Sequence, residues 1–190
     1  MAARNSGFVF FFFLAMNSFA QEMQESAREI NQTSEVHKNF VSMEAVESMC
    51  KAVYEQAIED SFKPELIIGL SRGGLVPLCF LAGEGNFNNR HVKTISVASY
   101  SDHGKRGQLK LLAPWGRQDF AYLKQFSAIL IVDDLVDSGK SISFVVDLVK
   151  KHVPHATVKT AALFYKRCSI INPDYYAQET TDWVVFPWEW

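Results

Sequence analysis

Residues 129–141 read Ile-Leu-Ile-Val-Asp-Asp-Leu-Val-Asp-Ser-Gly-Lys-Ser, and this stretch decides which fold we expect. Its four leading apolar residues predict a short buried strand, and Ser138 to Ser141 predict a turn that opens a helix. Asp133 and Asp134 follow the strand. In an open α/β sheet, ligands bind at the carboxyl ends of strands, and N–H groups at a helix start attract phosphate. Carboxylates beside such a cradle favour a ligand with hydroxyls, a divalent metal ion, or both, and a sugar phosphate fits.

The end of this stretch is similar to a nucleotide-binding loop but departs from it at one position. Residues 139–141, Gly-Lys-Ser, match the end of the pattern G-x-x-x-x-G-K-[ST], which needs glycine where this chain has Asp134. Three nearby carboxylates would repel a polyphosphate, so we reject a nucleoside triphosphatase. A receiver domain is disfavoured because its acidic pair lies near the domain start. Helix capping explains Asp137 or Ser138 alone, but not the whole polar set.

Three segments, in order, resemble motifs of the type I phosphoribosyltransferase family. Residues 129–141 resemble its signature for phosphoribosyl diphosphate (PRPP), and residues 67–77 resemble its pyrophosphate loop. Ser99 and Tyr100, before a polar stretch, resemble the start of its mobile catalytic loop. Several motifs in order are far more specific than any one alone. The resemblance runs from about Ser34 to the C-terminus.

A fourth segment resembles the purine pocket of the bacterial xanthine-guanine members of that family. The resemblance makes Lys166 a donor to the purine 6-oxo group and Trp183 a stacking partner of the base, with Val184 beside it. Val185 stands where those members have an acidic residue, and the chain lacks their C-terminal extension. The choice among xanthine, guanine and hypoxanthine therefore stays open. No role beyond packing or subunit contact is assigned to Trp188 and Trp190, and Trp115 is left unassigned.

The resemblance also implies how PRPP is bound. Asp133 and Asp134 would bind the ribose hydroxyls and hold Mg²⁺, directly or through water. Asp137 would manage the proton on the purine N7, while Ser99 and Tyr100 would close over the reacting centre. The 5′-phosphate would be cradled by four residues: Ser138, Gly139, Lys140 and Ser141. Pyrophosphate would bind four others, with a cis peptide after the first: Ser71, Arg72, Gly73 and Gly74.

The reaction implied is displacement of pyrophosphate from PRPP by a purine ring nitrogen, which salvages free oxopurines as nucleotides. The fold implied is α/β, a parallel twisted sheet with helices on both faces and a small hood for the base. Two alternatives remain. A non-catalytic PRPP-binding regulatory module would normally carry a DNA-binding domain or a basic face, and neither is evident. A phosphoribosyltransferase for a different base would keep the PRPP site but change the Lys166 and Trp183 pocket.

Composition fits one globular domain. The 190 residues are 48% hydrophobic and 21% charged with a net charge of −2, and no Lys/Arg run indicates nucleic-acid binding. The cysteines, Cys50, Cys79 and Cys168, are odd in number and far apart, so we expect buried free thiols rather than disulfides. Oligomeric state cannot be read from the sequence, and the resemblance favours a homo-oligomer.

The first residues differ from the rest. Arg4 precedes the apolar run 8–16, and small residues at Ser18 and Ala20 complete the layout of a secretory signal peptide. The run is too short to span a bilayer. Three explanations stay open: a mis-assigned start, a membrane-surface or export tag, or true export. Because the implied reaction is cytosolic, we favour a cytoplasmic domain over residues 34–190, with residues 1–33 outside the fold.

Hydrophobic patterning predicts alternating strands and helices, which indicates a parallel sheet covered on both sides. Ser42 is expected to cap a helix whose apolar stripe, Met43, Val46, Cys50, Val53 and Ala57, packs against the sheet. Strands are expected over residues 65–70, 92–100, 128–132, 157–164 and 184–186. Further helices are expected over residues 75–82, 118–125 and 139–151, and a polar loop over residues 101–110.

Overall fold

The structure is a computed structural model that describes residues 37–88, 91–100, 108–113 and 115–189. A compact unit begins at Asn39. Ser99, Tyr100 and Gln108 are described by their backbone alone. The signal-like segment and the polar linker lie outside the described residues. Within them, no helix combines the length and apolar composition needed to cross a bilayer.

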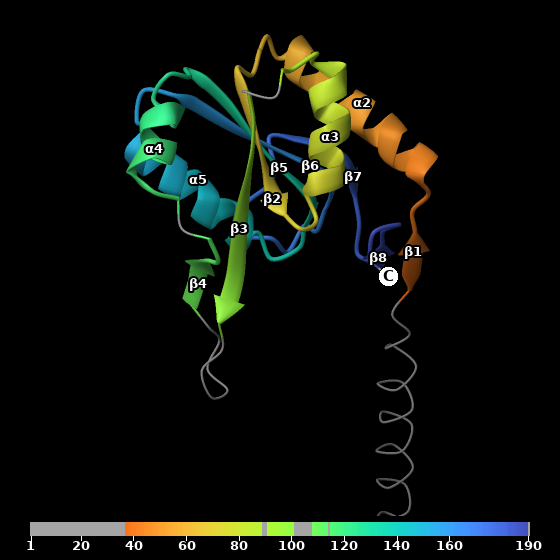
Figure 1. The fold of residues 1–190 in the computed structure, drawn as a ribbon. Helices are drawn as coiled ribbons and strands as arrows, with labels where there is room; N and C mark the ends of the chain where they lie inside the picture. The colour runs from red at the N-terminus through yellow and green to blue at the C-terminus, as the bar shows by residue number, and fades with distance from the viewer. Residues whose placement is uncertain (1–36, 89–90, 101–107, 114, 190) are drawn as a thin grey trace, which may run out of the picture. The chain divides into compact units, whose positions relative to one another are not determined.

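Six strands form the main sheet, in the order β4-β3-β2-β5-β6-β7 (Figure 1). Neighbouring strands are parallel except for β4, which runs antiparallel to β3. The strands are β2 (Leu66–Ser71), β3 (Val92–Tyr100), β4 (Gln108–Leu111), β5 (Ala128–Val136), β6 (Thr157–Tyr165) and β7 (Tyr175–Glu179). A separate two-stranded sheet joins β1 (Lys38–Phe40) and β8 (Trp183–Val185).

Helices cover both faces of the main sheet. Two of them, α2 (Met43–Glu59) and α3 (Leu75–Glu84), pack on one face, and α4 (Arg117–Leu123) and α5 (Lys140–His152) pack on the other (Figure 1). Alternation along each strand divides the core, because successive side chains of a strand point to opposite faces. Ile67 and Leu130 join the cluster under α2 and α3, whereas Ile68 and Ile131 join the cluster under α5.

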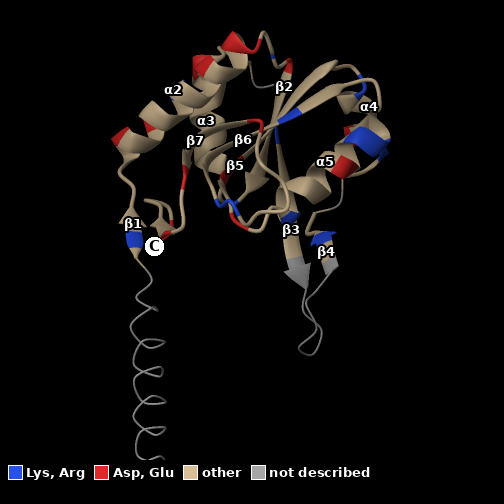
Figure 2. Cartoon of the chain, turned by 180° about the vertical axis from the view of Figure 1, so that it is seen from behind, with Lys and Arg blue, Asp and Glu red and all other residues tan. Residues whose placement is uncertain are grey.

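The start of helix α2 and the face that it buries follow from its local sequence. Its N-cap is Ser42, whose Oγ accepts a hydrogen bond from the Ala45 backbone N–H at 3.2 Å. The cap is confirmed, and four of the five residues of the predicted stripe are buried: Val46, Cys50, Val53 and Ala57. The prediction is wrong for Met43, which is exposed at the first position of the helix. Acidic residues lie along α2, whereas basic ones gather in the last turn of α5, where they complement the helix dipole (Figure 2).

Several expectations about the strands are wrong. Strand β5 does not stop at Val132 but continues through the acidic pair to Val136, because pairing with β6 continues to the register Val136–Tyr165. Gln108 to Lys110 are not loop but belong to β4, paired with the end of β3. Strands β1 and β7 were not expected. In β7, only the first residue is buried, and the following four alternate between exposed and half-buried. A strand of this kind gives a weak hydrophobic pattern in the sequence.

The expectation of three buried thiols is also wrong. Cys50 is buried in the α2 face of the core, but Cys79 and Cys168 are exposed. Cys79 lies on the outer side of α3, and Cys168 lies in the turn after β6. All three are free cysteines.

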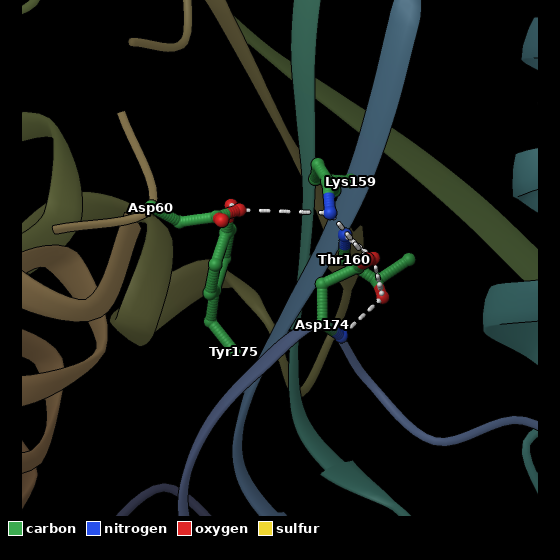
Figure 3. Close-up of polar contacts among 5 residues, drawn as sticks. All are labelled: Asp60, Lys159, Thr160, Asp174 and Tyr175. Atoms are coloured by element: carbon green, nitrogen blue, oxygen red, sulfur yellow. Dashed lines mark hydrogen bonds and ion pairs between the residues drawn. The ribbon is translucent and has the colours of Figure 1, made fainter. Parts of the chain in front are cut away.

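A polar cluster ties β6, β7 and the end of α2 together at the start of β7 (Figure 3). The buried Thr160 donates from its hydroxyl to Asp174 Oδ2 at 2.8 Å and accepts from the Asp174 N–H at 3.0 Å. Lys159 Nζ lies 3.1 Å from Asp174 Oδ1 and 3.7 Å from Asp60 Oδ2. Tyr175 donates from its hydroxyl to Asp60 at 2.8 Å. The cluster therefore fixes β7 to the sheet.

Replacing Thr160 tests this role in stability. The variant Thr160→Val keeps the shape but removes a buried hydroxyl that both donates to the Asp174 carboxylate and accepts from the Asp174 N–H, so the free energy of unfolding should fall by about 1–2 kcal/mol. The exposed Thr157→Val, on the same strand, is the matched control and should stay within about 0.5 kcal/mol. Urea unfolding measures both. Equal effects of the two substitutions would contradict the assignment.

Candidate active site

The carboxyl ends of the two central strands meet at one edge of the sheet. Strands β2 and β5 are hydrogen-bonded neighbours, with Gly69 opposite Val132, so the loop after β2 lies against the acidic pair of β5. A Cβ atom at Gly73 would overlap the Asp134 carboxylate, and one at Gly74 would lie 2.5 Å from the Val132 carbonyl oxygen. Only glycine permits this close approach of the two segments.

The loop after β2 has the backbone that the resemblance implies. The peptide between Ser71 and Arg72 is cis, which confirms the expectation. The Gly74 N–H donates to the Leu70 carbonyl at 2.8 Å and closes the turn. Arg72 is exposed, so its guanidinium can reach an anion at this edge.

The two carboxylates of β5 differ in their surroundings. Asp133 is half-buried, and its Oδ1 accepts from the Asp134 N–H at 3.1 Å. Asp134 is only 9% exposed, and its oxygens accept from the Leu135 N–H at 2.7 Å and the Trp188 indole N–H at 3.1 Å. Asp134 is therefore held mainly by the protein, whereas Asp133 has more of its surface free for a ligand.

Burial of the pair disfavours the charged forms. Desolvation raises the pKa of Asp133 well above its usual value, and the charge of Asp134 adds to the rise. Desolvation also raises the pKa of Asp134, although the N–H groups of Trp188 and Leu135 oppose the rise. A cation or ligand hydroxyls beside the pair would offset the free-energy cost of removing the charged carboxylates from water.

The carboxylates of Asp133 and Asp134 are suited to a magnesium ion that would bind together with a phosphate-containing substrate. Among the described residues, no group of three or more His, Cys, Asp or Glu side chains could hold a metal by itself. Magnesium commonly uses one or two carboxylates, waters and substrate phosphates. Asp133 and Asp134 supply such carboxylates, and the repulsion between these two neighbouring carboxylates favours a cation there.

The turn after β5 is shaped for an anion. Gly139 has φ +75° and is the N-cap residue of α5, without a side-chain capping bond. Neither Asp137 nor Ser138 therefore caps the helix, so the capping alternative is wrong. A Cβ atom at Gly139 would overlap Ser169 Oγ. The Ile170 N–H donates to the Ser138 carbonyl at 3.1 Å, so the turn after β6 supports the turn after β5.

The side chains expected to bind phosphate keep access to solvent. Ser138 and Lys140 are exposed, and Ser141 is half-buried. The first N–H groups of α5 have no partner within the helix, as at any helix start. The turn can therefore offer backbone and hydroxyl donors to a phosphate.

Two residues expected near the base form an ion pair. Lys166 Nζ lies 3.2 Å from Asp137 Oδ1, with side chains 19% and 62% exposed. Lys166 directly follows β6, and its N–H donates to the Val136 carbonyl at 2.9 Å. Because β5 and β6 are parallel neighbours, their ends bring the two side chains together. The ion pair therefore places a cation and a carboxylate just beyond the carboxyl ends of β5 and β6.

The other predicted residues lie on separate elements. Trp183 is 58% exposed and Val184 is buried, both on β8. Ser99 and Tyr100 end β3, where their backbone pairs with Leu109 and Gln108 of β4. Most of the expected catalytic loop, residues 101–107, lies outside the described residues.

Sequence reasoning missed the role of Trp188. Its indole reaches Asp134 across 54 positions of the chain. Nothing in the local sequence indicates a partner for this indole. A contact between a carboxylate and a distant tryptophan has no periodic signature.

The glycine loop yields a direct test. In Gly73→Ala the new methyl group displaces the Asp134 carboxylate or the loop, and we expect PRPP affinity to fall at least about tenfold. Gly83→Ala is the matched control, since a Cβ atom at that helical position meets nothing within 4 Å. It should keep wild-type affinity and gain at most about 1 kcal/mol of stability. Calorimetric titration with PRPP measures both, and equal affinities would refute the close packing.

Comparisons with known proteins agree with this geometry. Residues 32–190 match the family described as phosphoribosyl transferase domain. A purine phosphoribosyltransferase from Pyrococcus horikoshii is 33% identical, with 80% of this chain and 94% of that chain covered and a TM-score of 0.69. A xanthine-guanine-hypoxanthine phosphoribosyltransferase from Helicobacter pylori is 25% identical, with the same coverage and a TM-score of 0.70. The chain therefore belongs to the type I phosphoribosyltransferase family, in the group of purine phosphoribosyltransferases.

Proposed function

We propose that this chain transfers the 5-phosphoribosyl group of PRPP to a ring nitrogen of an oxopurine and releases pyrophosphate. The observation that carries the proposal is the ion pair between Lys166 and Asp137, which stands at the sheet edge that also carries the acidic pair. A purine with a 6-oxo group offers an acceptor for the ammonium and an N7 proton for the carboxylate. The names of the relatives from P. horikoshii and H. pylori support the same substrate class.

PRPP would lie across the carboxyl ends of β2 and β5. Its 5′-phosphate would take N–H and hydroxyl donors from residues 138–141, and its pyrophosphate would lie along residues 71–74. The ribose hydroxyls would donate to Asp133, the more accessible carboxylate of the pair. A bound Mg²⁺ would neutralise charge that develops on the departing pyrophosphate. Positioning and electrostatics would supply most of the acceleration of an oxocarbenium-like transition state.

The base would bind between the end of β6 and strand β8. Lys166 is the donor that separates oxopurines from adenine, whose 6-amino group offers hydrogens to a cation that can only donate. The exposed indole of Trp183 offers a face for stacking on the purine. Val185 supplies no charge for the purine 2-position, so the proposal covers xanthine, guanine and hypoxanthine alike.

Asp137 would accept the N7 proton as the new glycosidic bond forms. In the free protein its carboxylate pairs with Lys166, and an incoming oxopurine would separate the two and bind each. The ion pair would orient both side chains before the base arrives. Binding of the base would then replace this one charge-assisted contact with two.

A substrate panel tests the proposal. The protein is incubated with PRPP and Mg²⁺ and with xanthine, guanine, hypoxanthine, adenine or uracil, and nucleotide formation is followed. We expect product from one or more oxopurines and little from adenine or uracil. The absence of product with every oxopurine would refute the enzymatic function, and a preference for adenine would refute the role of Lys166.

Replacing Lys166, which removes its ammonium group, tests base recognition. In Lys166→Met the kcat/KM for the preferred oxopurine should fall by about 10–100-fold, the loss of a hydrogen bond from a charged donor. PRPP affinity should stay near that of the wild type. The exposed Lys150→Met on α5 is the control and should leave both values unchanged. Steady-state rates and calorimetry measure the two quantities.

Removing the proposed proton acceptor should act on turnover rather than on stability. For Asp137→Asn we expect kcat to fall about 100-fold or more. The thermal midpoint should change little, because Asp137 is 62% exposed and does not cap α5. The control is Asp147→Asn on the exposed side of α5, with unchanged kcat. A wild-type kcat in Asp137→Asn would exclude the proton role.

A further inference from the structure

The segment after β8 ends on a carboxylate of the PRPP site. Trp188 Nε1 donates to Asp134 Oδ2 at 3.1 Å, while the Leu135 N–H donates to Asp134 Oδ1 at 2.7 Å. Each oxygen of the carboxylate thus has a donor of its own, one from the backbone of β5 and one from the C-terminal segment. A planar carboxylate held at both oxygens has a fixed orientation.

Trp188 is itself firmly placed. Its ring stacks on Phe186 with centroids 4.7 Å apart and planes at 10°. Phe186 is 2% exposed and packs edge-on against Phe164 of β6 at 5.8 Å. Glu189 closes the turn, since its Oε2 accepts from the Phe186 N–H at 3.1 Å and its own N–H donates to the Phe186 carbonyl at 3.2 Å. The indole is therefore anchored to the core.

The orientation of Asp134 matters to its neighbours. The carboxylate fills the space beside Gly73, where a Cβ atom would overlap it. Rotation of the carboxylate would therefore disturb the loop expected to bind pyrophosphate. It would also change the oxygens that Asp134 offers beside Asp133. One hydrogen bond from the C-terminal segment thus acts on both parts of the PRPP site.

We propose that Trp188 is a positioning residue of the PRPP site: its indole N–H fixes the Asp134 carboxylate against the Gly73 loop. The inference rests on the proposed function, since it assigns Trp188 to PRPP rather than to the base.

The test removes the indole N–H and keeps an aromatic ring at position 188. In Trp188→Phe we expect the dissociation constant and the KM for PRPP to rise about tenfold, the loss of a hydrogen bond to a charged acceptor. The KM for the oxopurine should change less than about twofold. Calorimetry with PRPP and Mg²⁺ and initial rates with each substrate varied give the three values. A purely structural role would lower the active fraction, and hence kcat, without this selective change.

Two further proteins make the result decisive. Trp115→Phe deletes the same N–H from a half-buried tryptophan that packs against Phe120 on the α4 face, and it should keep wild-type PRPP affinity. Placing 3-benzothienylalanine at position 188 replaces the N–H by sulfur in a ring of the same shape. This protein should fold even if Trp188→Phe does not, and it should show the same loss of PRPP affinity.

The outcomes separate the inference from the function on which it rests. A wild-type protein that binds no PRPP and forms no nucleotide refutes the proposed function. An active wild type with unchanged PRPP affinity in the benzothienylalanine protein refutes the role of Trp188 alone. An equal loss in Trp115→Phe, or an equal rise in the KM for PRPP and for the base, also refutes it. A selective loss of PRPP affinity at position 188 supports it.

Discussion

Two carboxylates lie side by side at the carboxyl end of β5, where burial and their mutual repulsion raise the pKa of Asp133. Buried charges persist only where donors or cations compensate them. The protein supplies part of this compensation through the N–H groups of Asp134, Leu135 and Trp188. The proposed substrate, with its hydroxyls and an accompanying cation, would supply further compensation.

The surrounding loops are shaped by the space that this pair takes up. Gly73 and Gly74 lie against β5 where any side chain would collide with Asp134 or the Val132 carbonyl. On the other side, Gly139 lets the chain turn into α5 with φ +75° against the turn after β6. The sheet provides the rigid frame, and these loops provide the backbone that we propose binds the anionic groups of PRPP, a division of roles common in α/β proteins.

Much of the frame could be predicted from the sequence because burial leaves a local pattern. The apolar spacing of α2, apart from Met43, and the length of β3 are found in the structure as predicted. The end of β5 was missed because carboxylates rarely continue a buried strand, yet pairing with β6 carries the strand through them. Strand β7 was missed because its alternate residues are exposed and it follows β6 without an intervening helix among the described residues.

The sequence was sufficient to predict the order of the motifs, the acidic pair, the glycine turns and the alternation that builds a covered sheet, since each depends on residues close together in the chain. The pairing of Lys166 with Asp137 and the hydrogen bond from Trp188 to Asp134 are apparent only in the folded chain. The physical reason is the directionality of hydrogen bonds and ion pairs. Such contacts depend on where two distant strand ends place their side chains within about 3 Å, and no local pattern records that placement.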